Sequence, residues 1–314
     1  MHKYLFQLKI NTYNNRNPFY EIESLPNSDI KRVVLFGGQM QSLGRFKPIG
    51  RIRDIATTFI YLETIKPIEP ENRYHNLEKL CQMICLATGQ PANPEEVKID
   101  QNTTFESVFE EYKHSNHFED GVVYGGRVVE PNPIEKVVAY SHFLHKIDSG
   151  NNEKFENALQ TFCWAYELEM LPNPHLKYTL CMTLYLSSIN QLADNPKIKC
   201  RGDFMCTVCG DKIPNKEHSL SSHSKEMEKL IRNLITGDNV DLAVAQTKKL
   251  YSKIRSTYLH DGLLRGNERQ GGFLADIESE ENQKLVEDSM NLSTLNRMLI
   301  ELFLQHQANQ IDKV

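Results

Sequence analysis

The stretch DLAVAQTKKLYSKIRSTYLHDG, residues 241–262, has the residue spacing of one amphipathic helix that ends at a glycine. Projected at about 100° per residue, its apolar residues gather along one stripe that we expect to face a core. The members of this stripe are Ala243, Thr247, Leu250, Tyr251, Ile254 and Tyr258. Ser256 and His260 lie four residues apart on the other side, one above the other, with Arg255 at the border. The sequence therefore predicts a guanidinium, a hydroxyl and an imidazole near one helix end, away from the packed face.

The segment from Arg255 to His260 has the form R-x4-H, which resembles the motif of HEPN ribonucleases. Its flanks, LYSKIR before and HDG after, look like those of the Apea-like branch of that family, from which Asp261 between His260 and Gly262 is a departure. The resemblance covers residues 150–310. A histidine near a helix C-terminus and an arginine at a helix border also have an ordinary structural explanation, in the macrodipole and in contact with apolar neighbours.

The resemblance implies a metal-independent endoribonuclease, in which the ribose 2′-hydroxyl attacks the adjacent phosphate and leaves a 2′,3′-cyclic phosphate. His260 would act as general acid/base, because an imidazole titrates near neutral pH. Arg255 would clamp the phosphate and stabilise the transition state, because a guanidinium offers a planar fork of donors. Ser256 would orient His260 or contact the phosphate.

The resemblance also implies partners and a role. The substrate would be RNA, with tRNA among the candidates, and a homodimer would place two Arg255 helices face to face across a composite cleft. Because the net charge is −5, a local basic stripe must attract the RNA. Its expected members are Lys248, Lys249, Lys253 and Arg265. Members of the family often serve in defence against phage, so we expect an antiviral or toxin role.

Three alternative functions stay open at this point. The first is a non-catalytic HEPN module that binds nucleotide or RNA, or only dimerises. The second is nucleotidyl transfer within a toxin–antitoxin pair, for which Tyr258 is the residue of interest. The third is a zinc-dependent hydrolase centred on Cys206 and Cys209, whose activity would be lost in a chelator.

A cysteine cluster between two expected helices follows the pattern of a zinc knuckle. Cys200-x5-Cys206-Thr-Val-Cys209-Gly contains the turn C-x2-C-G, whose spacing lets two thiolates chelate one ion, and Gly210 relaxes the backbone of that turn. With Cys200 as third ligand, either His218 or His223 would complete a tetrahedral Cys3His site, which has no open position and is therefore structural. With the three cysteines as the only ligands, a water would occupy the fourth position.

The length of 314 residues predicts two domains, and 25% charged with 40% hydrophobic residues is an ordinary globular balance. We expect an α+β fold. Residues 1–140 would form a small α+β sensor or regulatory domain with an antiparallel sheet, and residues 141–314 an all-α HEPN bundle with a zinc-binding insertion at residues 196–224. The expected strands span residues 4–13, 19–23, 32–36 and 57–63, and the expected helices residues 76–88, 105–112, 152–170, 175–193, 217–236, 241–262 and 279–307.

No basic segment followed by an apolar run marks a signal peptide, and no apolar run approaches the ~20 residues that span a bilayer. Seven cysteines, scattered or at metal spacing, indicate a reducing compartment rather than a disulfide framework. We therefore expect a cytoplasmic protein with no membrane partner.

Residues 31–53 form a basic segment without any acidic side chain. Its members are Lys31, Arg32, Arg45, Lys47, Arg51 and Arg53. The segment would bind a phosphate backbone or a nucleotide, or it would be a solvated loop balanced by acidic neighbours in space, and the sequence leaves both open. A linker is expected at residues 128–133, VVEPNP, where two prolines interrupt the pattern.

Overall fold

A computed structural model gives the fold of the chain. It describes residues 1–8, 19–22, 29–37, 41–45, 52–55, 58–69, 73–89, 91–112, 123–124, 127–128, 133–170, 177–194, 196–199, 210, 217–219, 222–252 and 280–311. The backbone divides into two compact units, Met1–Asp148 with Ala308–Val314, and Ser149–Gln307. This division does not test the functions predicted for residues 1–140 and 141–314, which stay predictions.

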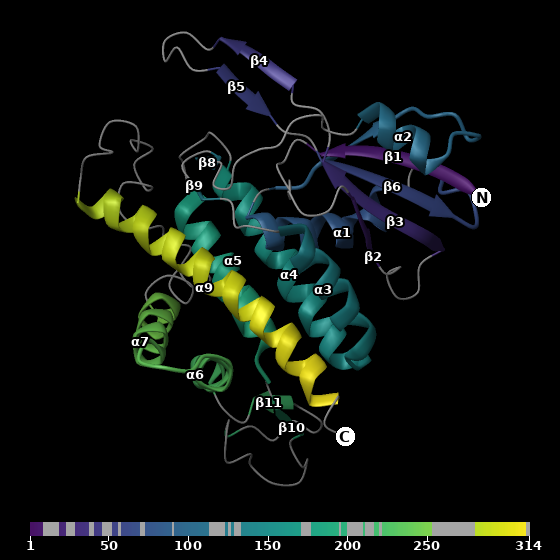
Figure 1. The fold of residues 1–314 in the computed structure, drawn as a ribbon. Coiled ribbons are helices and arrows are strands. Elements are labelled where there is room, and N and C mark those ends of the chain that lie inside the picture. Colours follow the sequence, from purple (N-terminus) through teal and green to yellow (C-terminus); the bar gives the residue numbers. More distant parts are fainter. Residues whose placement is uncertain are drawn as a thin grey trace. The chain divides into compact units, whose positions relative to one another are not determined.

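The first unit is built on a five-stranded antiparallel sheet of order β2-β3-β6-β1-β7 (Figure 1). Its strands are β1 (His2–Leu8), β2 (Phe19–Ile22), β3 (Ile30–Gly37), β6 (Thr58–Thr64) and β7 (Pro94–Val97). β-branched and aromatic residues fill the three central strands, as expected for a pleated surface with packed neighbours. Leu5 pairs with Tyr61 and Tyr61 with Val34, so these three residues share one face.

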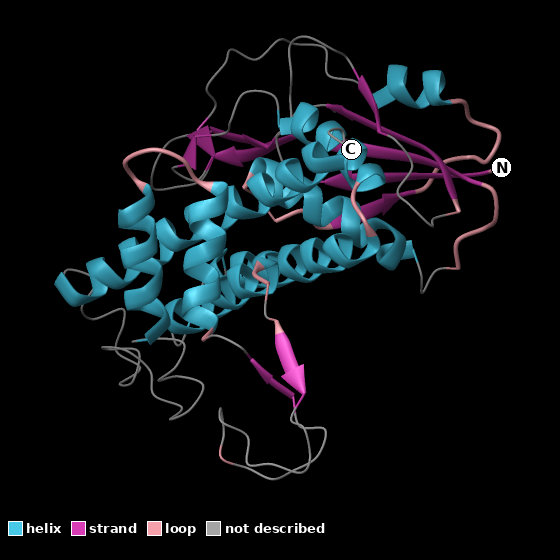
Figure 2. Cartoon of the chain, turned by 90° about the horizontal axis from the view of Figure 1, so that it is seen from below, coloured by secondary structure: helices cyan, strands magenta, loops and turns pink. Residues whose placement is uncertain are grey.

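Both faces of this sheet are buried. Helix α2 (Phe105–Tyr112) packs on the face of Leu5, Val34 and Tyr61 through the buried Phe105 and Val108. The alternate residues of the same strands are buried as well: Tyr4, Phe6, Val33, Leu35, Ile60 and Leu62. Helices α1 (Arg73–Thr88) and α3 (Pro133–Lys146) contact each other and the two edge strands, and Figures 1 and 2 show them on the side of the sheet away from α2. The sheet is therefore the middle layer of its unit.

Two short antiparallel strand pairs complete the first unit. β4 (Gln41–Arg45) pairs with β5 (Ile52–Ile55), and β8 (Val123–Tyr124) pairs with β9 (Arg127–Val128). Neither pair joins the five-stranded sheet.

The second unit is mostly helical. It contains α4 (Ser149–Met170), α5 (Lys177–Leu192), α6 (His223–Leu234), α7 (Val240–Leu250) and most of α9 (Glu280–Ile311). Helices α4 and α5 pack along each other, and α9 adds a third buried stripe. The largest buried side chains of α4 and α5 are Phe155, Phe162, Tyr166 and Tyr185. One strand pair, β10 (Lys197–Lys199) with β11 (Glu217–Ser219), lies outside the packed helices (Figure 2).

The coarse prediction of the fold is confirmed, because an antiparallel sheet in the N-terminal part is followed by a mostly helical C-terminal part. Several elements differ from prediction, and the strand pairs β4–β5 and β8–β9 as well as β10 were not predicted. Residues 133–146, next to the expected linker, form α3, and residues 94–97 form the unpredicted strand β7. Residues 217–219, expected to open a helix, form β11, so that helix α6 begins only at His223. No helix among the described residues is long and apolar enough to cross a membrane.

Candidate functional site

Helix α7 is the described part of the amphipathic stretch. Its buried residues are Val244, Thr247 and Leu250, while Ala243 and Tyr251 are half-buried. The described part of the predicted stripe therefore packs as expected, and Val244, which was not predicted, is buried with it. Ile254 and Tyr258 lie outside the described residues. The Thr247 hydroxyl is satisfied inside the helix, because it donates to the Ala243 carbonyl oxygen at 2.8 Å. Tyr251, which follows α7, still has helical dihedral angles (φ −58°, ψ −50°).

The turn between α6 and α7 depends on a glycine. Gly237 has φ +100°, a backbone conformation that residues other than glycine rarely adopt. The Gly237 carbonyl oxygen accepts a hydrogen bond from the Val240 amide at 3.4 Å, and Asn239 stands at the N-cap position of α7. A short connection thus brings the C-terminus of α6 close to the N-terminus of α7.

Four charged side chains form a chain of ion pairs between α6 and α7. The Lys248 ammonium lies 2.5 Å from Glu228 Oε2, and Arg232 Nε donates to Glu228 Oε1 at 3.1 Å. Arg232 Nη1 donates to Asp241 Oδ1 at 2.8 Å. Hydrogen bonds from Lys248 and Arg232 lower the pKa of Glu228, and hydrogen bonds to Asp241 and Glu228 raise the pKa of Arg232. Lys248, expected to attract RNA, is therefore already paired with a carboxylate.

The exposed residues of α6 include no acidic side chain. They are Lys225, Lys229, Arg232 and Asn233, whereas the two glutamates of the helix, Glu226 and Glu228, are half-buried. On α7, Lys249 is exposed and makes no ion pair with any described residue. The exposed carboxylate of α7 is Asp241, so the α6–α7 surface presents more cations than carboxylates even though the whole chain has a net charge of −5.

The predicted catalytic residues Arg255, Ser256 and His260 lie outside the described residues, as do Lys253 and Arg265. Of the expected basic stripe, the structure places Lys248 and Lys249 on α7. The structure therefore does not test how Arg255, Ser256 and His260 are arranged, and their roles stay predictions.

The predicted zinc ligands lie mostly outside the described residues, because Cys200, Cys206 and Cys209 fall there. His218 stands in β11 and His223 is the first residue of α6, after the N-cap residue Ser222. Within the part of the chain that the structure describes, no group of three or more His, Cys, Asp or Glu side chains is placed to hold a metal ion.

Two features next to the cysteines are described. β10 ends one residue before Cys200, and β11 pairs with it in the register Ile198↔His218 and Lys199↔Glu217. The strand pair therefore closes the base of the segment 200–216. Gly210, directly after Cys209, has φ +72° and open space where a Cβ would stand. Gly210 therefore has the left-handed conformation that favours glycine.

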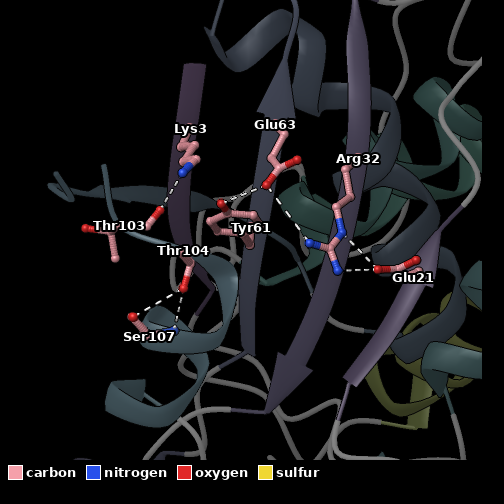
Figure 3. A network of polar contacts seen from close by, with 8 residues as sticks. All are labelled: Lys3, Glu21, Arg32, Tyr61, Glu63, Thr103, Thr104 and Ser107. Atoms are coloured by element: carbon pink, nitrogen blue, oxygen red, sulfur yellow. Dashed lines mark hydrogen bonds and ion pairs between the residues drawn. The ribbon is translucent and has the colours of Figure 1, made fainter. Parts of the chain in front are cut away.

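The basic segment 31–53 is divided by the fold. Arg32 stands on β3 of the five-stranded sheet, whereas Arg45 and Arg53 belong to the strand pair β4–β5. Figure 3 shows the surroundings of Arg32: its guanidinium pairs with Glu21 on β2, and its Nη1 lies 4.0 Å from Glu63 Oε1 on β6. At Arg32, the predicted alternative with acidic neighbours in space is therefore the one that the structure shows.

The Arg32 site is also tied to the aromatic core. The guanidinium carbon lies 5.0 Å from the centre of the Phe105 ring on α2, a cation–π arrangement. The Tyr61 hydroxyl donates to Glu63 Oε1 at 3.0 Å, and burial together with that carboxylate raises the pKa of Tyr61 far above its usual range. Arg32 on β3 thus connects β2, β6 and α2. We call Arg32 with Glu21, Glu63 and Phe105 the structural clamp, because these contacts hold the helix and the strands together.

A second set of contacts in Figure 3 fixes the start of α2. The Lys3 ammonium donates to the Thr103 carbonyl oxygen at 2.7 Å. Thr104 caps the helix, because its Oγ1 accepts a hydrogen bond from the Ser107 amide at 3.3 Å. These contacts hold α2 over the sheet face on which Phe105 packs.

A buried polar seam in the helical unit was not predicted. Glu169 on α4 is 7% exposed and accepts hydrogen bonds from the Tyr185 hydroxyl (2.7 Å) and from Ser289 (3.4 Å). Ser188 donates to the Ala158 carbonyl oxygen at 2.7 Å, and Asn296 Nδ2 donates to the Tyr185 carbonyl oxygen at 3.2 Å. The burial of Glu169 could have been predicted from the residue spacing, because Glu169 falls on the same helical stripe as the apolar residues of α4. These are Phe155, Leu159, Phe162 and Tyr166.

Comparison of the chain with protein-family models, with curated proteins and with solved structures found no match.

Proposed function

We propose that this protein is a metal-independent endoribonuclease of the HEPN type, with an antiviral or toxin role. The observation that carries the proposal is the R-x4-H motif of residues 255–260 on the amphipathic stretch that begins as α7. The packed face of α7 and the exposed cations of the α6–α7 surface support it. If the helix continues as predicted, Arg255 follows Lys248 by seven residues and lies on the same side of the helix.

Each motif residue has a role that its chemistry fits. His260 removes the proton of the attacking 2′-hydroxyl or returns one to the leaving 5′-oxygen, because an imidazole changes charge near neutral pH. Arg255 holds the phosphate oxygens and stabilises the charge that develops on them. Ser256 orients His260 or contacts the phosphate. One helix supplies one Arg and one His, so we propose a homodimer in which two such helices build the cleft.

Zinc is part of the proposal as a structural ion. Cys200, Cys206 and Cys209 would bind it as thiolates, and His218 or His223 would supply the fourth ligand. The fit rests on the positive φ of Gly210 and on the strand pair β10–β11, which already holds the two ends of the cysteine segment together. The ion would order a segment that is poor in apolar residues. We expect one zinc per chain by elemental analysis, and less than half of that in Cys206→Ser.

A nuclease assay tests the catalytic part. Total RNA and purified tRNA are incubated with the protein in EDTA, and the wild type is compared with His260→Ala, Arg255→Ala and the control His306→Ala, an exposed histidine on α9. We expect cleavage with cyclic-phosphate ends by the wild type and the control. Loss of the general acid/base or of the phosphate clamp costs about 10²- to 10⁴-fold in rate.

The other outcomes distinguish the alternatives. Cleavage that survives in both His260→Ala and Arg255→Ala would refute the assigned roles. Cleavage that disappears in EDTA while the fold persists would point to the zinc-dependent hydrolase at Cys206 and Cys209. RNA binding without cleavage would favour the non-catalytic HEPN module.

A further inference from the structure

Helix α6 carries a row of cations that the proposed reaction does not use. Lys225, Lys229 and Arg232 follow each other at spacings of four and three residues, so they lie on one side of the helix. With a rise of 1.5 Å per residue, the row extends about 10 Å along the helix axis. Met227 and Ile231, the buried residues of α6, lie on the opposite side. The row therefore faces solvent along most of the helix.

The position of the two lysines opposes the stability of the helix. Lys225 is the third residue of α6, in the first turn, where the helix dipole disfavours a cation. Lys225 and Lys229 are like charges at i and i+4, which repel each other on a helix surface. Neither ammonium makes an ion pair with any described residue. Glu228 and Glu226 lie three residues from Lys225 and Lys229, but they make no ion pair with these lysines, unlike the neighbouring chain Lys248–Glu228–Arg232–Asp241.

The row is continuous with the surface of α7. Arg232 belongs to the row and shares Glu228 with Lys248, so Glu228 joins the two helices. Lys249 extends the cationic surface beyond Lys248 on α7. This surface leads along the chain toward Arg255, which stands six residues after Lys249.

We propose that the row Lys225–Lys229–Arg232 of α6 binds the phosphate backbone of RNA next to the site of cleavage. The inference rests on the proposed function, which brings RNA to the neighbouring α7. It adds the substrate-binding surface: α6 would contact phosphates some distance from the scissile bond, whereas Arg255 contacts the phosphate that reacts. Such contacts carry no sequence information, so the row would strengthen binding of different RNAs alike.

The test measures binding without cleavage. A 2′-O-methyl RNA oligonucleotide, which lacks the attacking hydroxyl, is titrated with wild type and with the double variant Lys225→Gln/Lys229→Gln at several salt concentrations. The charge-matched control is Lys98→Gln/Lys284→Gln, two exposed lysines outside α6 and α7. Each lost phosphate contact lowers the salt slope by about 0.7 on single-stranded RNA, which corresponds to about fivefold in affinity at 0.1 M salt.

We therefore expect a loss of about 25-fold in the double variant at 0.1 M salt, and almost none in the control. Equal affinities for the double variant and the control would overturn the inference and leave the ribonuclease untouched, because cleavage of unmodified RNA is measured separately. Binding of poly-glutamate instead of RNA through the same lysines would also overturn it, in favour of an acidic protein partner.

Discussion

Two arginines that pair with carboxylates, Arg32 in the first unit and Arg232 in the second, differ in the exposed fraction of their side chains and in what surrounds them. In the sheet unit, the Arg32 side chain is 31% exposed, its partner Glu63 is 14% exposed, and its guanidinium lies over the Phe105 ring. The second partner of Arg32, Glu21, is 56% exposed. In the helical unit, Arg232 is 46% exposed, and its partners Glu228 and Asp241 are 26% and 84% exposed. Arg32 is therefore held by a ring and by partners on two strands, whereas Arg232 is more exposed and is held only by two carboxylates of the α6–α7 surface.

This difference separates a structural cation from an available one. An exposed ion pair contributes roughly 0–1 kcal/mol and is screened by salt, so a phosphate can replace its carboxylate at little cost. Arg32 cannot turn to a ligand without leaving the Phe105 ring and its partners on β2 and β6. Between two surfaces with similar charges, the less buried one is the better candidate for binding RNA.

The strongest way to break the structural clamp is to remove its ring. We expect Phe105→Ala, at a buried position of α2, to lower the free energy of unfolding by about 3–5 kcal/mol. Phe19→Ala is the control: its ring lies 5.1 Å from that of Phe105 but is 37% exposed, so its removal leaves a smaller cavity. Urea denaturation followed by circular dichroism measures both. Equal losses in the two variants would contradict the assignment of Phe105 to the core.

The helical unit has its own buried group, the seam around Glu169. Tyr185→Phe removes the hydroxyl that donates to Glu169 at 2.7 Å and leaves that buried oxygen short of a donor, for a loss of about 1–3 kcal/mol. Tyr178→Phe, at a half-buried position of the same helix, should change stability less. Urea midpoints of the two variants give the difference. A Tyr185→Phe variant as stable as wild type would show that the seam is not held by this bond.

A smaller effect, on RNA binding, is expected from removing the ion pairs of Glu228 with Lys248 and Arg232. Glu228→Gln frees Lys248 and Arg232 from their shared carboxylate, so RNA binding should tighten by up to about fivefold. Asp238→Asn, in the turn before α7, changes the net charge by the same amount without touching either cation. Fluorescence anisotropy with the 2′-O-methyl RNA compares the two. The same gain in both variants would assign it to net charge alone.

The smallest effect concerns pH. The pKa of Glu228 is lower in the folded protein than its usual value of 4.5, because Lys248 and Arg232 donate hydrogen bonds to it. Its stabilising contribution is therefore fully present above pH 4.5 and is lost as the pH falls through the lower folded pKa. The urea midpoint of wild type should exceed that of Glu228→Gln at pH 7, and the two should converge once the pH falls below the folded pKa of Glu228. A difference that grows in acid would have the wrong sign.

Elements with a local signal were predictable. The β-branched and aromatic residues of segments 32–36 and 57–63 predict the central strands, and the stripe of α7 is visible in the sequence. Helix α3 was missed because Pro131 and Pro133 were interpreted as a linker, although proline is favoured in the first turn of a helix, where Pro133 stands. Strand β7, PEEV, has a proline and two glutamates and forms only because β1 offers an edge.

What depends on distant partners could not be predicted. Residues 217–219 are a strand because residues 197–199 pair with them, and no local pattern announces that pairing. The pairing of Lys248 with Glu228 likewise depends on the packing of α6 against α7, so the sequence suggested a freer lysine than the structure has. The motif residues Arg255 and His260 rest on the sequence pattern alone.

The order of the sheet has a consequence for self-association. A strand with an open edge invites the edge of another molecule to add to it, and sheets resist this with short, charged or proline-containing outer strands. Here the outer strands are four residues long: β7 contains Pro94, which lacks an amide hydrogen, and the exposed Glu95 and Glu96, while β2 contains the exposed Glu21. The outer strands thereby disfavour growth of the sheet into aggregates and edge-to-edge pairing between copies of the chain.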